Sequence, residues 1–346
     1  MVNRKALPSM TLLRELTDQI VLDTVFGQAP ITRAEIAQCT GISKTTVSEA
    51  VRRLEDAGLL LTAGTQTGRQ GRVGTYYQVA ADAGFAVAVD LNSTEIRVRA
   101  ADLFGVPFLD EWHAPTDPPC QLRGLVTRAI DRGMAEHRRL LAVGVSVANP
   151  VDPATESVVE LPDTPYPQGL FRPQEVLDGL FEAPLLVDND VNLAAIAERW
   201  HGAGRDVHSF AYVHIGAGMG MGLVIGDQLV RGSHGVAGEI GYLPLDSGLR
   251  QGFTLAVLGS PNTAARGAVI GRAIASVCAL VDPELVLLGG PLGLDPDLLD
   301  PVRATVAELA PVPPKIEFGA LGESAAVRGA LEQALQRGRA DLWAKA

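Results

Sequence analysis

The first eighty residues follow the 3.6-residue period of helices and then change to short strand-like runs. Over residues 10–28 the apolar side chains recur every three to four positions, which predicts a helix. Thr32, with Glu35 three residues later, is a capping-box pattern and predicts a second helix that ends at Gly41. Two apolar runs flank a glycine-rich loop over residues 59–79. These runs predict a β-hairpin that follows the helices.

A third predicted helix lies between the second helix and the hairpin. Ser43 is placed to cap its first turn, and Gly58 ends it. One face of this helix is apolar and is expected to pack inward, whereas the other face is polar. The polar face carries hydroxyl and cationic side chains that suit contact with DNA: Lys44, Thr45, Thr46, Ser48 and Arg52. We therefore expect it to be the recognition helix of a helix-turn-helix.

The loop of the predicted hairpin reads AGTQTGRQGRVG and contains Arg69 and Arg72 but no acidic residue. Glycine allows a close approach to DNA, and arginine suits the narrow, electronegative minor groove. Taken singly, the helices and the loop also fit a module that serves only dimerisation or linkage. Their order, from capping box to arginine-containing loop, instead predicts a winged helix-turn-helix DNA-binding domain over residues 1–80.

The remaining residues, 81–346, contain two stretches with the same pattern. From Phe85 the chain is predicted to form three successive strands with a tight turn at Asn92-Ser93. Residues 210–230 again indicate two strands about a glycine-rich turn, followed by a third segment. Two related lobes that face each other would bring both turns to one cleft, a place suited to a nucleotide phosphate. The prediction is an α/β body made of two lobes.

Composition and charge narrow the function further. Of 346 residues, 47% are hydrophobic and 20% are charged, which is typical of a soluble protein with two or three packed units. The net charge is −11, but residues 1–80 hold 9 Lys and Arg against 7 Asp and Glu, whereas residues 81–346 hold 20 against 33. A mildly basic head on an acidic body is compatible with nucleic-acid binding by the head.

Neither the cysteines nor the apolar segments indicate export. Cys39, Cys120 and Cys278 are scattered without CxxC spacing, so they predict neither a disulfide framework nor a zinc site. The first ten residues lack the apolar core of a signal peptide. No run is expected to reach the roughly 18 apolar residues of a membrane span. We therefore expect a cytoplasmic protein without membrane contact.

Several motifs resemble those of the ROK family, which unites sugar kinases and sugar-responsive repressors. They are, in chain order, GRQGRVG leading into FAVAVDL, GVSVANPVDPATESVV at 144–159, VDNDVNLAAIAERWHGAG at 187–204, GAGMGMGLVIGDQLVRGSHGVAGEIGYLPLD at 216–246 and VDPELVLLGG at 281–290. The resemblance covers nearly the whole chain. It implies a winged helix-turn-helix followed by a two-lobed actin-like ATPase (sugar kinase-like) fold, with a sugar held between the lobes.

The resemblance also implies a set of sugar-binding residues. Asn189 and Asp190 match an Asn-Asp pair whose aspartate takes a proton from the sugar hydroxyl in the kinases; in a repressor it would only accept a hydrogen bond. Glu239 matches a glutamate that accepts further sugar hydroxyls, and Asn149 stands in a loop where the family usually has a Pro-Gly pair. A structural alternative is that Asp190 caps a helix that begins near Val191.

Two departures from the family pattern argue against an active kinase, and a third argues against structural zinc. The first phosphate turn, Asp-Gly-Gly-Thr in active members, is DLNST at 90–94, so side chains stand where bare backbone would meet a phosphate. The second turn has Ala217 in place of the threonine of Gly-Thr-Gly. Phosphoryl transfer depends almost wholly on positioning and charge stabilisation, so both changes count against it. Tyr242 replaces the histidine after GEIG, and no cysteine cluster follows, so we expect no structural zinc.

Together these observations predict a homodimeric or homotetrameric repressor without cofactor or enzymatic activity. It would bind a double-stranded, inverted-repeat operator and be released by a sugar or sugar derivative. The predicted sugar contacts are Asn149, Asn189, Asp190, Glu239 and Tyr242. Two alternatives are an active sugar kinase with a regulatory head and a constitutive DNA-binding protein whose body only oligomerises.

Overall fold

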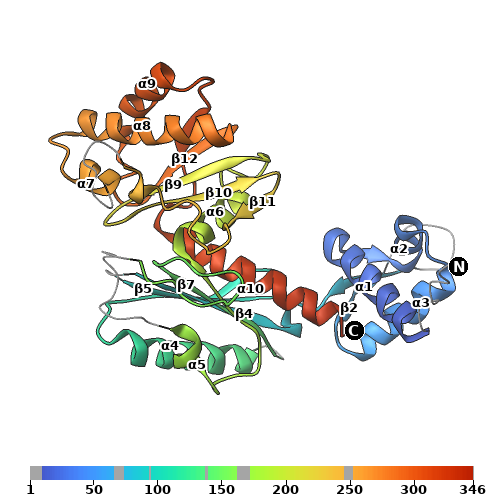
Figure 1. Cartoon of the computed structure of the whole chain (residues 1–346). Helices are drawn as coiled ribbons and strands as arrows, with labels where there is room; N and C mark the ends of the chain where they lie inside the picture. Colours follow the sequence, from blue (N-terminus) through green and yellow to red (C-terminus); the bar gives the residue numbers. More distant parts are fainter. Residues whose placement is uncertain are drawn as a thin grey trace, which may run out of the picture.

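The computed structural model describes residues 10–65, 74–92, 95–136, 139–161, 172–244 and 252–345. Within them the chain forms a small head beside one end of a two-lobed body (Figure 1). The last helix, α10 (Ala325–Trp343), runs from between the lobes to the head, where the C-terminus lies (Figure 1). The head and the body are therefore joined twice, by the chain that leaves the head and by α10.

The head consists of three helices and a three-stranded sheet of order β1-β3-β2. Its elements are α1 (Met10–Gln28), β1 (Ile31–Thr32), α2 (Arg33–Thr40), α3 (Lys44–Asp56), β2 (Leu60–Thr65) and β3 (Thr75–Val79). The predicted capping box is present, because Thr32 Oγ1 accepts from Glu35 N and Glu35 Oε2 accepts from Thr32 N. Gly41 follows α2 with φ of 72°, a left-handed conformation that favours glycine. The predicted helices and hairpin are confirmed.

The head core is completed by side chains from the body. Val21, Leu22 and Val25 of α1 are fully buried in it. The body adds five buried side chains to the same core: Ala83, Leu103, Leu141, Leu342 and Trp343. Since the last two belong to α10, the C-terminal helix of the chain is part of the hydrophobic core of the head.

The first lobe has a five-stranded sheet of order β6-β5-β4-β7-β8 between two helical layers. Its elements are β4 (Phe85–Leu91), β5 (Ile96–Asp102), β6 (Pro107–His113), α4 (Pro118–Glu136), β7 (Leu140–Val147), α5 (Pro173–Leu177) and β8 (Leu185–Asn189). Along β4, Phe85, Val87 and Val89 pack with α4, whereas Ala86 and Ala88 face α10. Alanine at these positions lets α10 lie close to the sheet.

The second lobe repeats the topology of the first. Its elements are α6 (Asp190–His201), β9 (Phe210–Ile215), β10 (Met219–Ile225), β11 (Gln228–Val230), α7 (Gly252–Leu258), α8 (Thr263–Val281), β12 (Leu285–Gly289), α9 (Leu299–Leu309) and β13 (Lys315–Phe318). In both sheets three successive antiparallel strands are followed by two parallel ones. The predicted pair of related lobes is confirmed. Helix α6 packs against both α10 and β10.

Helix α8 corrects the expectation that no segment is apolar enough to cross a membrane. Its 19 residues include an 18-residue window of mean hydropathy 1.6, so it passes a test of length and composition. Half of that window is buried, and a Cβ on Gly267 or Gly271 would run into Pro301 or Thr305 of α9. The apolar character of α8 thus serves packing within the second lobe.

Candidate functional site

Helix α3 turns its apolar face to the head core and its polar face to solvent. Ser43 Oγ accepts a hydrogen bond from Thr46 N at 3.2 Å, so the predicted N-cap is present. Its buried side chains are Val47, Ala50, Val51 and Leu54. Of the predicted DNA contacts, Lys44, Thr45 and Arg52 are exposed. The other two, Thr46 and Ser48, are partly buried. All five belong to the side that is not in the core, and their contact with DNA stays a prediction.

An ion pair between a buried aspartate and a partly exposed arginine, which the sequence did not predict, holds α3 against α1. Arg53 donates from Nε to Asp18 Oδ2 at 2.9 Å and from Nη2 to Oδ1 at 2.6 Å. Asp18 is only 2% exposed. A bidentate pair of this kind sets orientation as well as distance, so it fixes how α3 lies on α1. No local sequence spacing links two residues that are 35 positions apart.

The predicted wing contacts, Arg69 and Arg72, lie in the segment 66–73, outside the described residues. The strands on either side are in place, because Thr65 at the end of β2 pairs with Thr75 at the start of β3. The contact of this loop with DNA stays a prediction.

A cavity of about 260 Å³ lies between the two lobes. Both predicted turns reach it, with Asn92 from the first lobe and Ala217 and Gly218 from the second. Asp190 at the start of α6 and Ala325 at the start of α10 also line it. Pockets for drug-sized ligands hold roughly 300–1,000 Å³, so this cavity suits a smaller molecule such as a monosaccharide. The predicted cleft is present where the two turns meet.

Three of the five predicted sugar contacts line this cavity: Asp190, Glu239 and Tyr242. Asn149 is buried, and its Nδ2 donates to Val159 O at 3.4 Å. Neither Asn149 nor Asn189 is among the lining residues. The structure therefore brings the two carboxyl groups and the tyrosine together in one cavity wall, whereas the two asparagines are buried and do not line it.

Asn189 is the N-cap of α6, a role that the structural alternative had given to Asp190. Asn189 Oδ1 accepts from Val191 N at 3.0 Å and from Asn192 N at 3.2 Å. Its Nδ2 donates to Asp190 Oδ1 at 3.1 Å, and Val191 N donates to the same oxygen at 2.7 Å. These bonds orient the Asp190 carboxyl group through its Oδ1.

Burial raises the pKa of three carboxyl groups in the cavity wall. The pKa of Asp90 rises to about 7, that of Asp190 to about 6 and that of Glu239 to about 7. Loss of hydration is the largest cause in each case, and the negative charge of Asp190 adds to the shift of the other two. Ser146 Oγ donates to Asp90 Oδ1, which opposes the rise. Near neutral pH these groups both accept and donate hydrogen bonds.

A salt-bridge cluster at the edge of the cavity was not anticipated. Arg97 on β5 is 2% exposed and donates to Glu95 Oε1 at 2.6 Å and to Glu323 Oε2 at 2.9 Å. Its guanidinium lies 4.4 Å from the ring centroid of Trp112. Both glutamates line the cavity. The sequence shows only an arginine in an alternating strand, because Arg97 and Glu323 are 226 positions apart.

The histidine of the cavity wall is uncharged at neutral pH, since burial lowers the pKa of His214 to about 4. Within the described ranges, no group of three or more His, Cys, Asp and Glu side chains is arranged to hold a metal ion. His234, set aside as isolated, is exposed and lies 3.9 Å from Asp152. The cavity chemistry is that of carboxyl and hydroxyl groups.

The raised carboxyl pKa values predict a pH-dependent stability. A carboxyl with a higher pKa when folded binds more protons in the folded chain, so stability is lost as pH rises from the unfolded to the folded pKa. For Glu239 that window runs from about 4.3 in the unfolded chain to about 7. Glu239→Gln stays neutral, so relative to the natural chain it should gain about 1–2 kcal/mol of unfolding free energy between about pH 5 and pH 8.

Urea denaturation at about pH 5 and about pH 8 measures this change in the free energy of unfolding. Glu175→Gln is the matched control, because the Glu175 side chain is 70% exposed and its replacement should act alike at both pH values. A difference between Glu239→Gln and the natural chain that does not change with pH would contradict the prediction.

The head and the body together define a class of protein: a winged helix-turn-helix attached to a two-lobed, sugar-kinase-like body. The sequence model of the ROK family matches residues 86–268, and that of the MarR family matches residues 20–70. The chain belongs to the ROK family.

Relatives of this chain include regulators and kinases. It is 25% identical over 242 residues to the xylose repressor of Caldicellulosiruptor bescii. The aligned region covers 68% of this chain and 60% of that protein. It is 27% identical over 164 residues to the glucokinase of Halalkalibacterium halodurans. That aligned region covers 45% of this chain and 49% of the glucokinase. The chain thus spans about 60% of the length of the repressor it matches.

Among solved structures, a ROK family transcriptional regulator described as a homolog of the E. coli MLC protein has the same architecture. It superposes with a TM-score of 0.75 at 18% sequence identity, over 96% of this chain and 99% of that one. At this identity the likeness concerns the fold. The predicted fold class, a winged helix-turn-helix followed by an actin-like kinase fold, is confirmed.

Proposed function

We propose that this protein is a cytoplasmic, sugar-responsive transcriptional repressor. Residues 1–80 form its DNA-binding domain, and residues 81–346 bind the effector and oligomerise. The observation that carries this proposal is the placement of α10, which lines the cavity with Ala325 and Ala326 and enters the head core with Leu342 and Trp343. A helix shared by both sites gives cavity occupancy a physical route to the head. The similarity to a xylose repressor supports the same function.

In the proposed complex the sugar hydroxyls bind to Asp190 and Glu239, whose carboxyl groups line the cavity. Tyr242 adds its ring and hydroxyl to the same wall. Asn189 acts through Asp190, because its Nδ2 holds one carboxylate oxygen and leaves the other for the ligand. Asn149 contacts the sugar after the hydrogen bond of 3.4 Å from its Nδ2 to Val159 O breaks.

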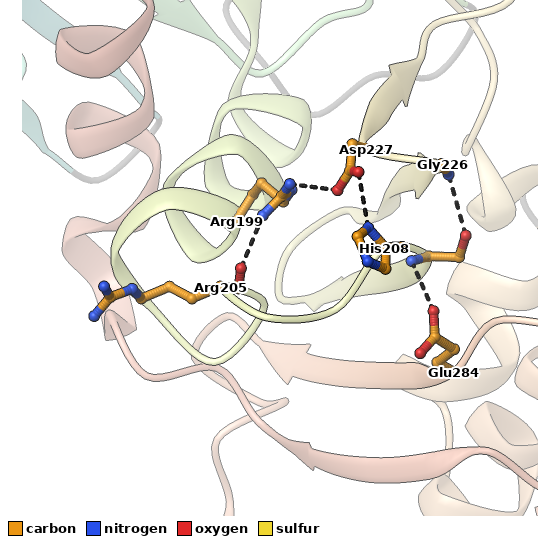
Figure 2. A network of polar contacts seen from close by, with 7 residues as sticks. Arg199, Arg205, His208, Gly226, Asp227 and Glu284 are labelled. Atoms are coloured by element: carbon orange, nitrogen blue, oxygen red, sulfur yellow. Dashed lines mark hydrogen bonds and ion pairs between the residues drawn. The ribbon is translucent and has the colours of Figure 1, made fainter. Parts of the chain in front are cut away.

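Movement of the second lobe is transmitted through α6. Arg199 near the end of α6 pairs with Asp227 in the β10–β11 turn, and His208 Nδ1 lies 2.8 Å from the other oxygen of Asp227 (Figure 2). Ser209 extends the cluster by binding Gly226 N through Oγ and Glu284 through its own N–H (Figure 2). These contacts make α6 move with the second lobe as one unit.

Helix α6 in turn is locked to α10, and α10 to the head. A Cβ on Gly329 of α10 would overlap Leu193 O of α6, so the two backbones are in direct contact. At the other end of α10, the Trp343 ring meets Phe26 of α1 edge to face at 5.9 Å, and the Arg339 guanidinium lies 5.1 Å from the Phe26 ring centroid. Closure of the lobes on a sugar therefore shifts the head, together with the first lobe on which α10 lies, relative to the second lobe.

A shift of this kind matters when two heads read one operator. A symmetric dimer places its two recognition helices at a fixed separation, and an inverted repeat mirrors that symmetry. A sugar weakens DNA binding only if it binds the DNA-free arrangement more tightly than the DNA-bound one. We propose that sugar-induced closure favours a separation of heads that does not fit the operator.

The rival function, an active kinase, conflicts with the charge of the cavity. Kinases place cations around the transferred phosphoryl group. Here the described wall contains Asp90 and Glu95 beside the first turn and no lysine or arginine. Arg97, which pairs with the lining residues Glu95 and Glu323, has its charge balanced by these two glutamates. These charges favour a sugar sensor over an ATP-dependent kinase.

Fluorescence anisotropy with an operator selected from random DNA tests the proposal across a panel of monosaccharides that includes xylose and glucose. One sugar should release the DNA, and Asp190→Asn should abolish that response while DNA binding persists. Arg52→Ala is the reciprocal variant, because it should weaken DNA binding but keep sugar binding. ATP consumption that depends on a sugar and is lost in Asp190→Asn would establish the kinase instead. DNA affinity that no sugar changes would leave a constitutive DNA-binding protein.

A further inference from the structure

Residues 231–239 follow β11 and lead from the sheet of the second lobe to Glu239 in the cavity wall. We call this segment the strap. Its backbone closes on itself, because Ala237 N donates to Arg231 O at 3.2 Å. Near its other end, Gly238 O accepts from a backbone N–H of β10 at 2.8 Å. The strap is therefore a compact loop that is fixed to the second lobe and carries Glu239.

The first residue of the strap is bonded to the first lobe. Asp188 Oδ2 accepts from Arg231 Nε at 3.0 Å and from Arg231 Nη2 at 2.6 Å. Asp188 belongs to β8, lies two residues before Asp190 and is 3% exposed. A carboxylate this deeply buried needs a cation and hydrogen-bond donors to offset its lost hydration. The pair thus ties the strap to the strand that leads into Asp190.

The middle of the strap lies directly on the first lobe. Gly235 has φ of 76°, and a Cβ at this position would run into Val151 O. Val151 is part of the hydrophobic core of the first lobe. The left-handed conformation and the close approach both require glycine. The strap therefore has two contacts with the first lobe, one through a salt bridge and one through the backbone.

The strap and β8 bring two carboxyl groups together in the cavity wall. The charge of Asp190 contributes to the raised pKa of Glu239, so these two groups lie near each other. Arg231 is not among the residues that line the cavity. Its effect on a ligand must therefore pass through Glu239 at one end of the strap and Asp190 beyond its partner Asp188.

We propose that Arg231 is a positioning residue, which holds the two lobes at the angle where Glu239 and Asp190 contact the same sugar. This inference rests on the proposed sugar-sensing function and adds the contact that sets the geometry of its site. Loss of the Arg231–Asp188 pair frees the strap from β8. The lobes then take up a wider range of angles, and the separation of the two sugar-binding carboxyl groups is no longer fixed.

The distance between the lobes tests this inference without any sugar. Cys120 and Glu308 are exposed on α4 and α9, which lie on the outer sides of the two lobes (Figure 1). Nitroxide labels on Cys120 and at Glu308→Cys, in a Cys39→Ser chain, report this distance by double electron–electron resonance. Cys278 is buried and stays unlabelled. Arg231→Gln should give a longer and broader distance distribution, and an unchanged distribution would overturn the inference.

Matched variants distinguish positioning from a general loss of stability. Arg205→Gln makes the same change at an exposed arginine of the second lobe and should leave the distribution unchanged. Arg231→Lys keeps the charge but loses the two-donor geometry, so it should widen the distribution less than Arg231→Gln. If Arg231→Gln does not fold, Arg231→Lys must still widen the distribution.

A double-mutant cycle tests whether Arg231 acts through Asp188. Asp188→Asn should widen the distribution as Arg231→Gln does, and the double variant should widen it no further, because both changes remove the same contact. Additive effects of the two changes would show that Arg231 acts elsewhere and would overturn the inference.

Calorimetric titration with the panel of monosaccharides relates the interlobe distance to ligand binding. A sugar of the panel that binds the natural chain should bind Arg231→Gln about tenfold more weakly, a loss of about 1.4 kcal/mol. Unchanged affinity in a chain with a wider distance distribution would overturn the positioning role. If no sugar binds the natural chain, the sugar-sensing function fails, whereas the distance measurement still decides whether Arg231 holds the lobes together.

Discussion

Gly329→Ala should lower the free energy of unfolding by about 3 kcal/mol, because a Cβ at this position overlaps a backbone carbonyl and not a flexible side chain. The atom in the way is Leu193 O of α6. To admit a methyl group, α10 and α6 must separate, and the small residues that pack there, such as Ala330, lose contact. Urea denaturation measures the loss.

Gly124→Ala is the matched control for this substitution. Gly124 also lies in a helix, α4, but the nearest atom to its added Cβ is Arg128 Nη1 at 3.8 Å. Alanine has the higher helix propensity, so this variant should gain about 1 kcal/mol. The same change at two helical glycines is thus expected to act in opposite directions. Equal effects at both would contradict the close contact of α6 with α10.

Trp343→Ala should be costly for the head even though it lies at the far end of the chain. Trp343 is 4% exposed and belongs to the hydrophobic core of the head. Truncation of a buried tryptophan costs about 3–5 kcal/mol. Because this ring also ties α10 to Phe26, the sugar should lose its effect on DNA binding. Thermal unfolding should show the head melting before the body.

Two further variants distinguish a loss of coupling between the cavity and DNA binding from a loss of stability of the head. Trp200→Ala removes a tryptophan that is 52% exposed on α6, and it should change stability by less than about 1 kcal/mol. Phe104→Ala removes the half-exposed ring stacked on Phe26 at 5.0 Å, so it loosens the same contact while the head remains folded. A normal sugar response in both Trp343→Ala and Phe104→Ala would contradict transmission through α10.

Local signals in the head were reliable guides to its structure. The pairing of Thr32 with Glu35, the Ser43 cap and the left-handed Gly41 each involve residues within a few positions of one another. Their physical effects are therefore contained in short segments of sequence. The Asp18–Arg53 pair, which orients the recognition helix, joins distant positions and had no such signal.

The candidate site was predicted in part. Asp190, Glu239 and Tyr242 were identified through the family resemblance, and all three line the cavity. Their contact with a sugar stays a prediction. Asn189 was also expected to bind the ligand, which stays a prediction; in the structure its side-chain oxygen caps α6. The resemblance matches residue types, whereas hydrogen-bond geometry decides which atoms remain available.

Local periodicity and residue type were enough to predict the helices and hairpin of the head and the strands of two related lobes, and the family resemblance indicated Asp190 and Glu239. The path of α10 from the cavity to the head core and the pairing of Glu323 with Arg97 became visible only in the folded chain. These features join residues that are far apart in the chain. Their contacts arise from the packing of whole elements, which no short segment encodes.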